Sequence, residues 1–268
     1  MKLNSHIFEY HSSPVNWCEP DYAVSQHTAE FWNSVTNIPM LIVAPIMMHL
    51  YRDFACVVPH CKRVNIVWGL VVVIGIGSIY FHSTLSLFGQ FMDEVAILWM
   101  TYAIMAMWTH PSLLHLPKYF ENHRAHYQYL LCSMAVISTF LGFLKPELNH
   151  FFLFAYWIPL VKLLRELFQI KFKDRRVHQI GKNGSVVLLV AFLCWLSDRM
   201  ICNFWLAIRF PYMHAIWHIL MLTSGYYLSV FVSFGYAWRT LLGITPSLKF
   251  WRAFPFTDAI GLYYVGFD

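Results

Sequence analysis

Residues 64–83 read VNIVWGLVVVIGIGSIYFHS, an apolar run that contains no Asp, Glu, Lys or Arg. A helix of about 20 such residues crosses the hydrocarbon core of a bilayer. In lipid, only helices and closed barrels satisfy every backbone hydrogen bond, and a continuous run of this length lacks the alternation of a barrel strand. The run therefore predicts a transmembrane helix, with Ser78 and His82 near its end.

Other apolar stretches lie on both sides of this run. We expect them to span the membrane at 31–51, 94–110, 127–144, 150–168, 184–202 and 213–235. Hydrophobic residues make up 58% of the 268 residues and charged residues only 12%, which lies outside the usual range of soluble proteins. The sequence thus predicts an all-α polytopic membrane protein with seven transmembrane helices.

All seven spans are expected to form one domain over residues 1–268. Residues 1–30 are polar and lack the apolar core of a signal peptide, so we expect them to stay on the mature protein outside the bilayer. Residues 236–268 are expected to form a tail. Pro246, Pro255 and charged residues predict irregular structure there from Trp238 onward.

The orientation in the membrane is predicted by Lys and Arg, which concentrate in the first, third and fifth loops and the tail. They are Arg52, Lys62, Arg63, Lys118, Arg124, Lys171, Lys173, Arg175, Arg176, Lys182, Arg239, Lys249 and Arg252. Because basic loops stay cytoplasmic, the N-terminus should be lumenal or extracellular and the C-terminus cytosolic. The net charge of +5 then reflects topology and not nucleic-acid binding. The glycosylation sequon at 183–185 falls in a cytosolic loop and should be unmodified.

This orientation brings three histidines to the same membrane depth. His214 and His218, four residues apart, share one face at the lumenal start of the seventh span, and His82 lies at the lumenal end of the second. Three histidines are an established ligand set for catalytic zinc. Asp93 and Asp198 are expected on the same side.

The residues alone leave the role of this cluster open. Histidine and carboxylate are costly in an apolar run, so they face the bundle interior, where they can bind a metal, pin the helices together or relay protons. Ser78 lies one turn deeper than His82 on the same face. Gly75 and Gly77 beside it suggest a close helix approach, which gives Ser78 a structural alternative.

The N-terminal segment is rich in the oxygen donors that calcium prefers. These are Asn16, Trp17, Glu19, Asp21 and Glu30. A solvated acidic segment is the commoner use of such residues. Cys18 and Cys202 both fall on the lumenal side, where disulfides persist, so they are a plausible pair.

Five short stretches together resemble the alkaline ceramidases, which belong to a superfamily of seven-helix membrane hydrolases that includes the adiponectin receptors. They are NWCE at 16–19, AEFWN at 29–33, GSIYFH at 77–82, MDE at 92–94 and HAIWH at 214–218. The resemblance covers nearly the whole chain through the seventh span. It implies a zinc-dependent amidase of the endoplasmic reticulum or Golgi membrane that cleaves ceramide to a sphingoid base and a free fatty acid.

The resemblance also implies roles for particular residues. His82, His214 and His218 match the zinc ligands, while Ser78 and Asp93 match the polar residues of the catalytic centre. In that chemistry Asp93 shuttles a proton from the attacking water to the leaving amine, and Ser78 holds the carbonyl oxygen. Asp198 has no family role, and a pair with Arg199 or a bundle contact is the simpler interpretation.

A structural calcium site and a disulfide are implied as well. The calcium ligands map to Asn16, the Trp17 carbonyl, Glu19, Asp21 and Glu30. The family pattern has Asp where Asn16 stands and Asn where Asp21 stands, which leaves the formal charge unchanged, so we expect calcium binding. Cys18 and Cys202 match a disulfide between the N-terminal segment and the end of the sixth helix.

Two other functions remain as alternatives. One is a seven-helix lipid receptor or transporter with a zinc site, which predicts polar residues strung along the bilayer depth. The other is a hydrolase of another lipid amide or ester. An intramembrane metalloprotease is disfavoured because the sequence contains no His-Glu-x-x-His motif. Oligomeric state has no signature in the sequence.

Overall fold

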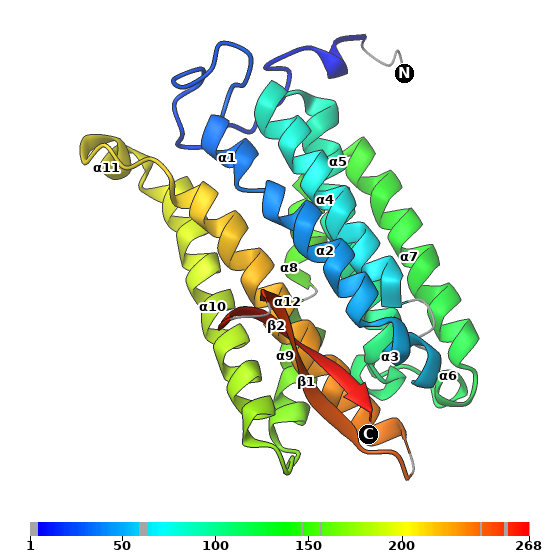
Figure 1. The fold of residues 1–268 in the computed structure, drawn as a ribbon. Coiled ribbons are helices and arrows are strands. Elements are labelled where there is room, and N and C mark those ends of the chain that lie inside the picture. Colours follow the sequence, from blue (N-terminus) through cyan, green and yellow to red (C-terminus); the bar gives the residue numbers. More distant parts are fainter. Residues whose placement is uncertain are drawn as a thin grey trace.

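The computed structural model describes residues 5–58, 64–145, 147–155, 157–241, 243–254 and 257–267. Its long helices run side by side in an elongated bundle, with the N-terminus at one end and the C-terminus toward the other (Figure 1). Six helical stretches in this part of the chain are long and apolar enough to cross a membrane. They are Phe31–Leu50 (α1, Phe31–Val35, with α2, Ile38–Leu50), α4 (Val64–Thr84), α5 (Leu87–Trp108), α7 (Arg124–Leu144), α10 (Arg175–Met200) and α12 (Met213–Thr240).

The span expected at 150–168 differs from the others. The structure has two shorter helices there, α8 (Glu147–Ala155) and α9 (Trp157–Phe168), on either side of residue 156, which lies outside the described residues. Neither helix alone is long enough to cross a bilayer. A seventh crossing therefore stays a prediction.

Short elements precede or connect the long helices. They are η1 (Ser5–Phe8), α3 (Arg52–Val57), η2 (Pro111–Leu114), α6 (Tyr119–Asn122) and α11 (Cys202–Ala207). The basic residues Lys62 and Arg63 of the first loop lie outside the described residues.

Two helices begin earlier than expected because side chains cap them. Ser86 accepts a hydrogen bond from the Gly89 amide, so α5 starts at Leu87, and Asp93 lies inside the helix and not at its start. Asp174 caps α10 at Arg175 in the same way. The sequon at 183–185 therefore lies in a helix and not in the expected loop.

Small residues let α4 approach both of its neighbours, as expected. A Cβ atom on Gly75 would lie 3.0 Å from the Leu41 side chain of α2. One on Gly77 would lie 3.3 Å from the Met92 backbone of α5. This contact brings Asp93, the next residue of α5, against the face of α4 that carries Ser78.

The chain is mostly helical, as expected, but the prediction of an irregular tail is wrong. Strands β1 (Pro246–Phe254) and β2 (Thr257–Phe267) form an antiparallel hairpin in which Leu248 pairs with Val265. Both of these side chains are buried in the main apolar core. Pro246 predicts an interruption of regular structure, but it is the first residue of β1, a position where a strand tolerates proline.

The hairpin packs on an aromatic cluster that we call the aromatic end: Tyr51, Phe54, Trp68 and Phe267. The Tyr51 ring lies 5.3 Å from the Phe54 ring and 6.1 Å from the Trp68 ring, measured between centroids. Phe267 of β2 stacks on Phe54 at 6.2 Å. Tyr51 and Phe54 are fully buried, so this end is held by apolar packing.

Candidate metal centre

The three predicted histidines meet at the end of the bundle that carries the N-terminal segment. His82 comes from the last turn of α4, and His214 and His218 come from the first two turns of α12. One ring nitrogen of each lies within 4.8 Å of those of the others, and all three side chains are buried. Among the described residues, no other group of three His, Cys, Asp or Glu side chains lies this close together.

Each of these rings leaves one buried nitrogen without a hydrogen-bond partner. The atoms are Nε2 of His82, Nδ1 of His214 and Nε2 of His218. A buried polar atom that lacks a partner costs about 1–3 kcal/mol, so three in one cluster call for a common ligand. Three imidazoles that each offer a free nitrogen fit the three-ligand set of a catalytic zinc. The cluster can therefore hold a metal ion.

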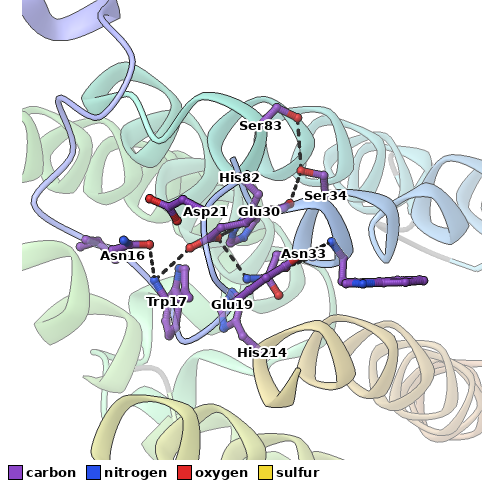
Figure 2. Close-up of polar contacts among 12 residues, drawn as sticks. Asn16, Trp17, Glu19, Asp21, Glu30, Asn33, Ser34, His82, Ser83 and His214 are labelled. Atoms are coloured by element: carbon purple, nitrogen blue, oxygen red, sulfur yellow. Dashed lines mark hydrogen bonds and ion pairs between the residues drawn. The ribbon is translucent and has the colours of Figure 1, made fainter. Parts of the chain in front are cut away.

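The second ring nitrogen, Nδ1, of both His82 and His218 contacts a side-chain oxygen. The two oxygens belong to residues just before and within the first span. His82 Nδ1 lies 2.5 Å from Glu30 Oε2, and His218 Nδ1 lies 3.0 Å from Thr36 Oγ1. Figure 2 shows Glu30 reaching His82 beside the N-terminal segment. A histidine that binds a metal usually donates its other N–H to an oxygen acceptor, which fixes the orientation of the ring. Both contacts have this form.

His214 is oriented differently, by ring stacking and by Asp198. The Trp17 ring lies over the His214 ring at 3.5 Å between centroids and 17° between planes. Asp198 accepts hydrogen bonds from the backbone amides of His214, at 3.2 Å, and Cys18, at 3.0 Å. Asp198 belongs to α10, and a carboxylate beside the N-terminus of α12 also suits the positive end of that helix's dipole. The bundle contact that the sequence suggested for Asp198 is thus confirmed.

Ser78 and Asp93 lie one turn below the histidines. Ser78 is buried, precedes His82 by four residues of α4, and so lies about 6 Å further along the helix axis. Its side chain lies near the Asp93 carboxyl group of α5. The pair sits at the close α4–α5 contact, which places a carboxylate and a hydroxyl together beneath the histidine cluster.

The five predicted calcium ligands lie together in the N-terminal segment (Figure 2). The Trp17 amide donates to Asn16 Oδ1 at 2.9 Å and to Glu30 Oε1 at 3.0 Å. Asp21 Oδ1 is buried and has no hydrogen-bond partner. The carboxylates of Glu19, Asp21 and Glu30 do not form a cluster as tight as that of the histidines.

Glu19 has a structural function that the sequence did not reveal. Its two carboxylate oxygens accept the amides of Trp32, at 2.7 Å, and Asn33, at 2.8 Å, so it caps the start of α1. The local sequence gives no sign of this cap, because Glu19 precedes the start of α1 by more than ten residues.

Burial sets the electrostatics of this segment. Desolvation raises the pKa of the Glu19 and Asp21 carboxyl groups, and the nearby charge of Glu30 adds to the rise in both pKa values. Desolvation raises the pKa of Glu30 to about 7. A cation bound among these groups would offset the cost of charging them.

The predicted disulfide is present between Cys18 and Cys202, with 5.4 Å between the Cα atoms. It joins the N-terminal segment to the start of α11. Together with Asp198 and the Trp17 stack, it holds the segment against the first turn of α12. The sequence suggested a bundle contact for Asp198 but not which groups it contacts, and it gave no role to Thr36, because neither residue lies in a recognisable metal-site motif.

Comparisons with known proteins identify the family of this chain. A family model described as Ceramidase matches residues 9–257. The chain is 36% identical to the alkaline ceramidase of Drosophila melanogaster over 241 residues, which cover 90% of this chain and 83% of the relative. It is 33% identical to human alkaline ceramidase 1 over 245 residues, which cover 91% of each chain. The chain therefore belongs to the ceramidase family of hydrolases.

Proposed function

We propose that this enzyme is a zinc-dependent amidase that cleaves ceramide to a sphingoid base and a free fatty acid. The proposal rests on one observation in a member of the ceramidase family: three buried histidines each direct an unpartnered nitrogen into one cluster. His82, His214 and His218 would hold the zinc ion. Relatives named as alkaline ceramidases supply the substrate class.

The chemistry follows from the groups beneath the cluster. Zinc, when bound, makes a water molecule acidic near neutral pH and polarises the substrate carbonyl. Asp93 takes a proton from the attacking water and later gives it to the leaving amine nitrogen, so it ends the cycle unchanged. Ser78, on the same face of α4, donates a hydrogen bond to the carbonyl oxygen as negative charge develops there.

Calcium would stabilise the segment that supports this centre. Its proposed ligands are Asn16, the Trp17 carbonyl, Glu19, Asp21 and Glu30. Support comes from the buried, unpartnered Asp21 Oδ1 and from the raised pKa values of the three carboxyl groups. Because Glu30 also contacts His82, calcium would stiffen one support of the zinc site.

The proposed topology has seven spans in one domain, with α8 and α9 together forming the fifth. The N-terminus is lumenal and the C-terminus cytosolic, in the membrane of the endoplasmic reticulum or Golgi. The disulfide supports this orientation, since it lies at the N-terminal end and disulfides persist in the lumen. The hairpin end, with the basic loops, is then cytosolic.

The distribution of buried ionisable groups argues against the receptor or transporter alternative. A proton or ion relay needs such groups at successive depths of the bilayer. In the described part of the chain, the buried carboxylates and imidazoles all lie at the N-terminal end of the bundle. They are Glu19, Glu30, His82, Asp198, His214 and His218.

The test is fatty-acid release from ceramide by membranes that contain the wild type or His214→Ala, with and without a zinc chelator. We expect turnover by the untreated wild type alone. His49→Ala, which removes an exposed histidine from α2, is the control and should retain full activity. If the wild type binds zinc but leaves ceramide intact, the metal site stands and the substrate assignment falls.

A further inference from the structure

We infer that Thr36 is a positioning residue that fixes the tautomer of His218, so that the Nε2 lone pair of this histidine faces the metal. The inference deepens the proposed function, since it assumes that the histidine cluster binds a metal ion. It concerns the contact on the side of the His218 ring that faces away from the histidine cluster, where Thr36 Oγ1 lies 3.0 Å from His218 Nδ1.

Thr36 reaches His218 because the first span is interrupted. Helix α1 ends at Val35 and α2 begins at Ile38, with Pro39 in its first turn. Pro39 has no amide proton, so it cannot donate to the carbonyl of Val35 and continue α1 into α2. The interruption leaves the side chains of Thr36 and Asn37 against the second turn of α12.

The single proton of the Thr36 hydroxyl decides whether this group donates to His218 or accepts from it. A hydroxyl has one proton to donate and two lone pairs that accept. The Thr36 hydroxyl donates to the Trp32 carbonyl at 2.8 Å, and the Asn33 carbonyl lies further away at 3.3 Å. Its proton is therefore used within α1, and its oxygen can only accept from His218. Nδ1 of His218 must then carry the ring proton.

Asn37 does not replace Thr36 as the partner. Its Nδ2 lies 3.3 Å from His218 Nδ1, but it donates to the Asn33 carbonyl at 2.8 Å. If the Asn37 amide were turned around, its oxygen would face that carbonyl and the hydrogen bond would be lost. The Asn37 amide has a second N–H, but its nitrogen lies further from His218 Nδ1, at 3.3 Å, than Thr36 Oγ1 does, at 3.0 Å, so Thr36 is the closer partner.

The proton on Nδ1 decides what the opposite nitrogen can do. A neutral imidazole carries one proton, so Nε2 of His218 holds a lone pair. That atom is buried, has no hydrogen-bond partner, and belongs to the cluster with His82 and His214. Glu30 gives His82 the same arrangement, with an oxygen at Nδ1 and a free Nε2. The junction of α1 and α2 is thus part of the metal site's support.

The experiment measures zinc affinity of the purified full chain by competition with a chelator, without substrate. Thr36→Val keeps the branched shape but removes the hydroxyl, and we expect about 10–100-fold weaker zinc binding, the usual cost of losing such a contact. Thr36→Ser keeps the acceptor and should bind as the wild type does. Thr223→Val is the matched control, because the Thr223 hydroxyl donates to the Ile219 carbonyl of α12 at 2.8 Å.

The outcomes separate this inference from the proposed function. If Thr36→Val binds zinc as tightly as the wild type, the inference is wrong, whatever the substrate. If wild-type protein binds zinc but does not hydrolyse ceramide, only the function fails. Nitrogen NMR of the wild type with isotope-labelled histidine gives a second readout that needs no folded variant. A His218 ring protonated at Nε2 would also overturn the inference.

Discussion

The histidine end and the aromatic end of the bundle are built from different interactions. At the first, the Nδ1 atoms of His82 and His218 each contact an oxygen of a residue far away in sequence, Glu30 and Thr36. At the second, Tyr51, Phe54 and Trp68 pack through their rings. A hydrogen bond requires a partner at one position, whereas ring packing depends on total buried area.

Because the two ends differ in this way, substitutions at one end should affect function and substitutions at the other should affect stability. Removing a polar group near the histidines should change metal binding or rate while most of the apolar core remains. Removing a ring at the aromatic end should lower the free energy of unfolding while the metal site keeps its geometry. The predictions below test whether the two ends are independent in this sense.

The largest effect is expected for Asp93→Ala, which removes the proposed proton shuttle. The rate of ceramide hydrolysis should fall about 10²–10⁴-fold while zinc content stays at the wild-type level. Steady-state kinetics and metal analysis measure the two quantities. Glu94→Gln is the neighbouring control, since Glu94 accepts from Gln90 and Asn149. Loss of zinc from Asp93→Ala would mean that Asp93 is itself a ligand.

Phe54→Ala should produce the opposite result at the aromatic end. Truncating this fully buried ring should lower the free energy of unfolding by about 3–5 kcal/mol. Zinc affinity of the folded protein should not change. Denaturant unfolding in detergent and chelator competition give the two values. A matching loss of zinc affinity would show that the two ends are coupled.

Glu30→Gln is expected to have a smaller effect, confined to the histidine end. Gln has the shape of Glu but no charge, so the contact to His82 Nδ1 weakens and zinc binding should fall about 10–100-fold. The measurement belongs in calcium-free buffer, where the second proposed role of Glu30 does not contribute. Wild-type zinc affinity in this variant would remove Glu30 from the support of the zinc site.

The smallest effect is expected for the pH dependence of calcium binding. A carboxyl group must lose its proton to bind a cation, and burial raises the pKa of Glu30 to about 7. Calcium affinity should therefore rise with pH, by up to about tenfold per unit from this group, and level off above about pH 7. Calcium titrations at several pH values measure this slope. A flat profile below pH 7 would exclude Glu30 as a ligand.

The sequence predicted features that depend on local pattern. Apolar run length located six of the seven expected spans, and the spacing of His214 and His218 together with the expected alternation of span direction predicted that His82 lies beside them, as it does. Features that depend on distant contacts were missed. The Glu19 cap on α1 and the pairing of Leu248 with Val265 leave no local signature, because each partner looks ordinary in its own segment.

The interrupted first span illustrates the same limit. Residues 31–51 are apolar enough to suggest one continuous helix, yet Pro39 divides it. Hydropathy measures the cost of transfer into lipid and is insensitive to one missing amide proton. The side chain of Thr36 therefore had no assigned purpose until the position of α12 was known.

The disulfide between Cys18 and Cys202 has a consequence for biosynthesis. The two cysteines are 184 residues apart, and His214 and His218 follow the second of them. During translation, the N-terminal segment is made first but has neither its covalent partner nor its stacking partner until almost the last helix emerges. Loading of the proposed metal site would therefore be a late event, because a chain truncated before α12 retains most of its spans but lacks His214 and His218.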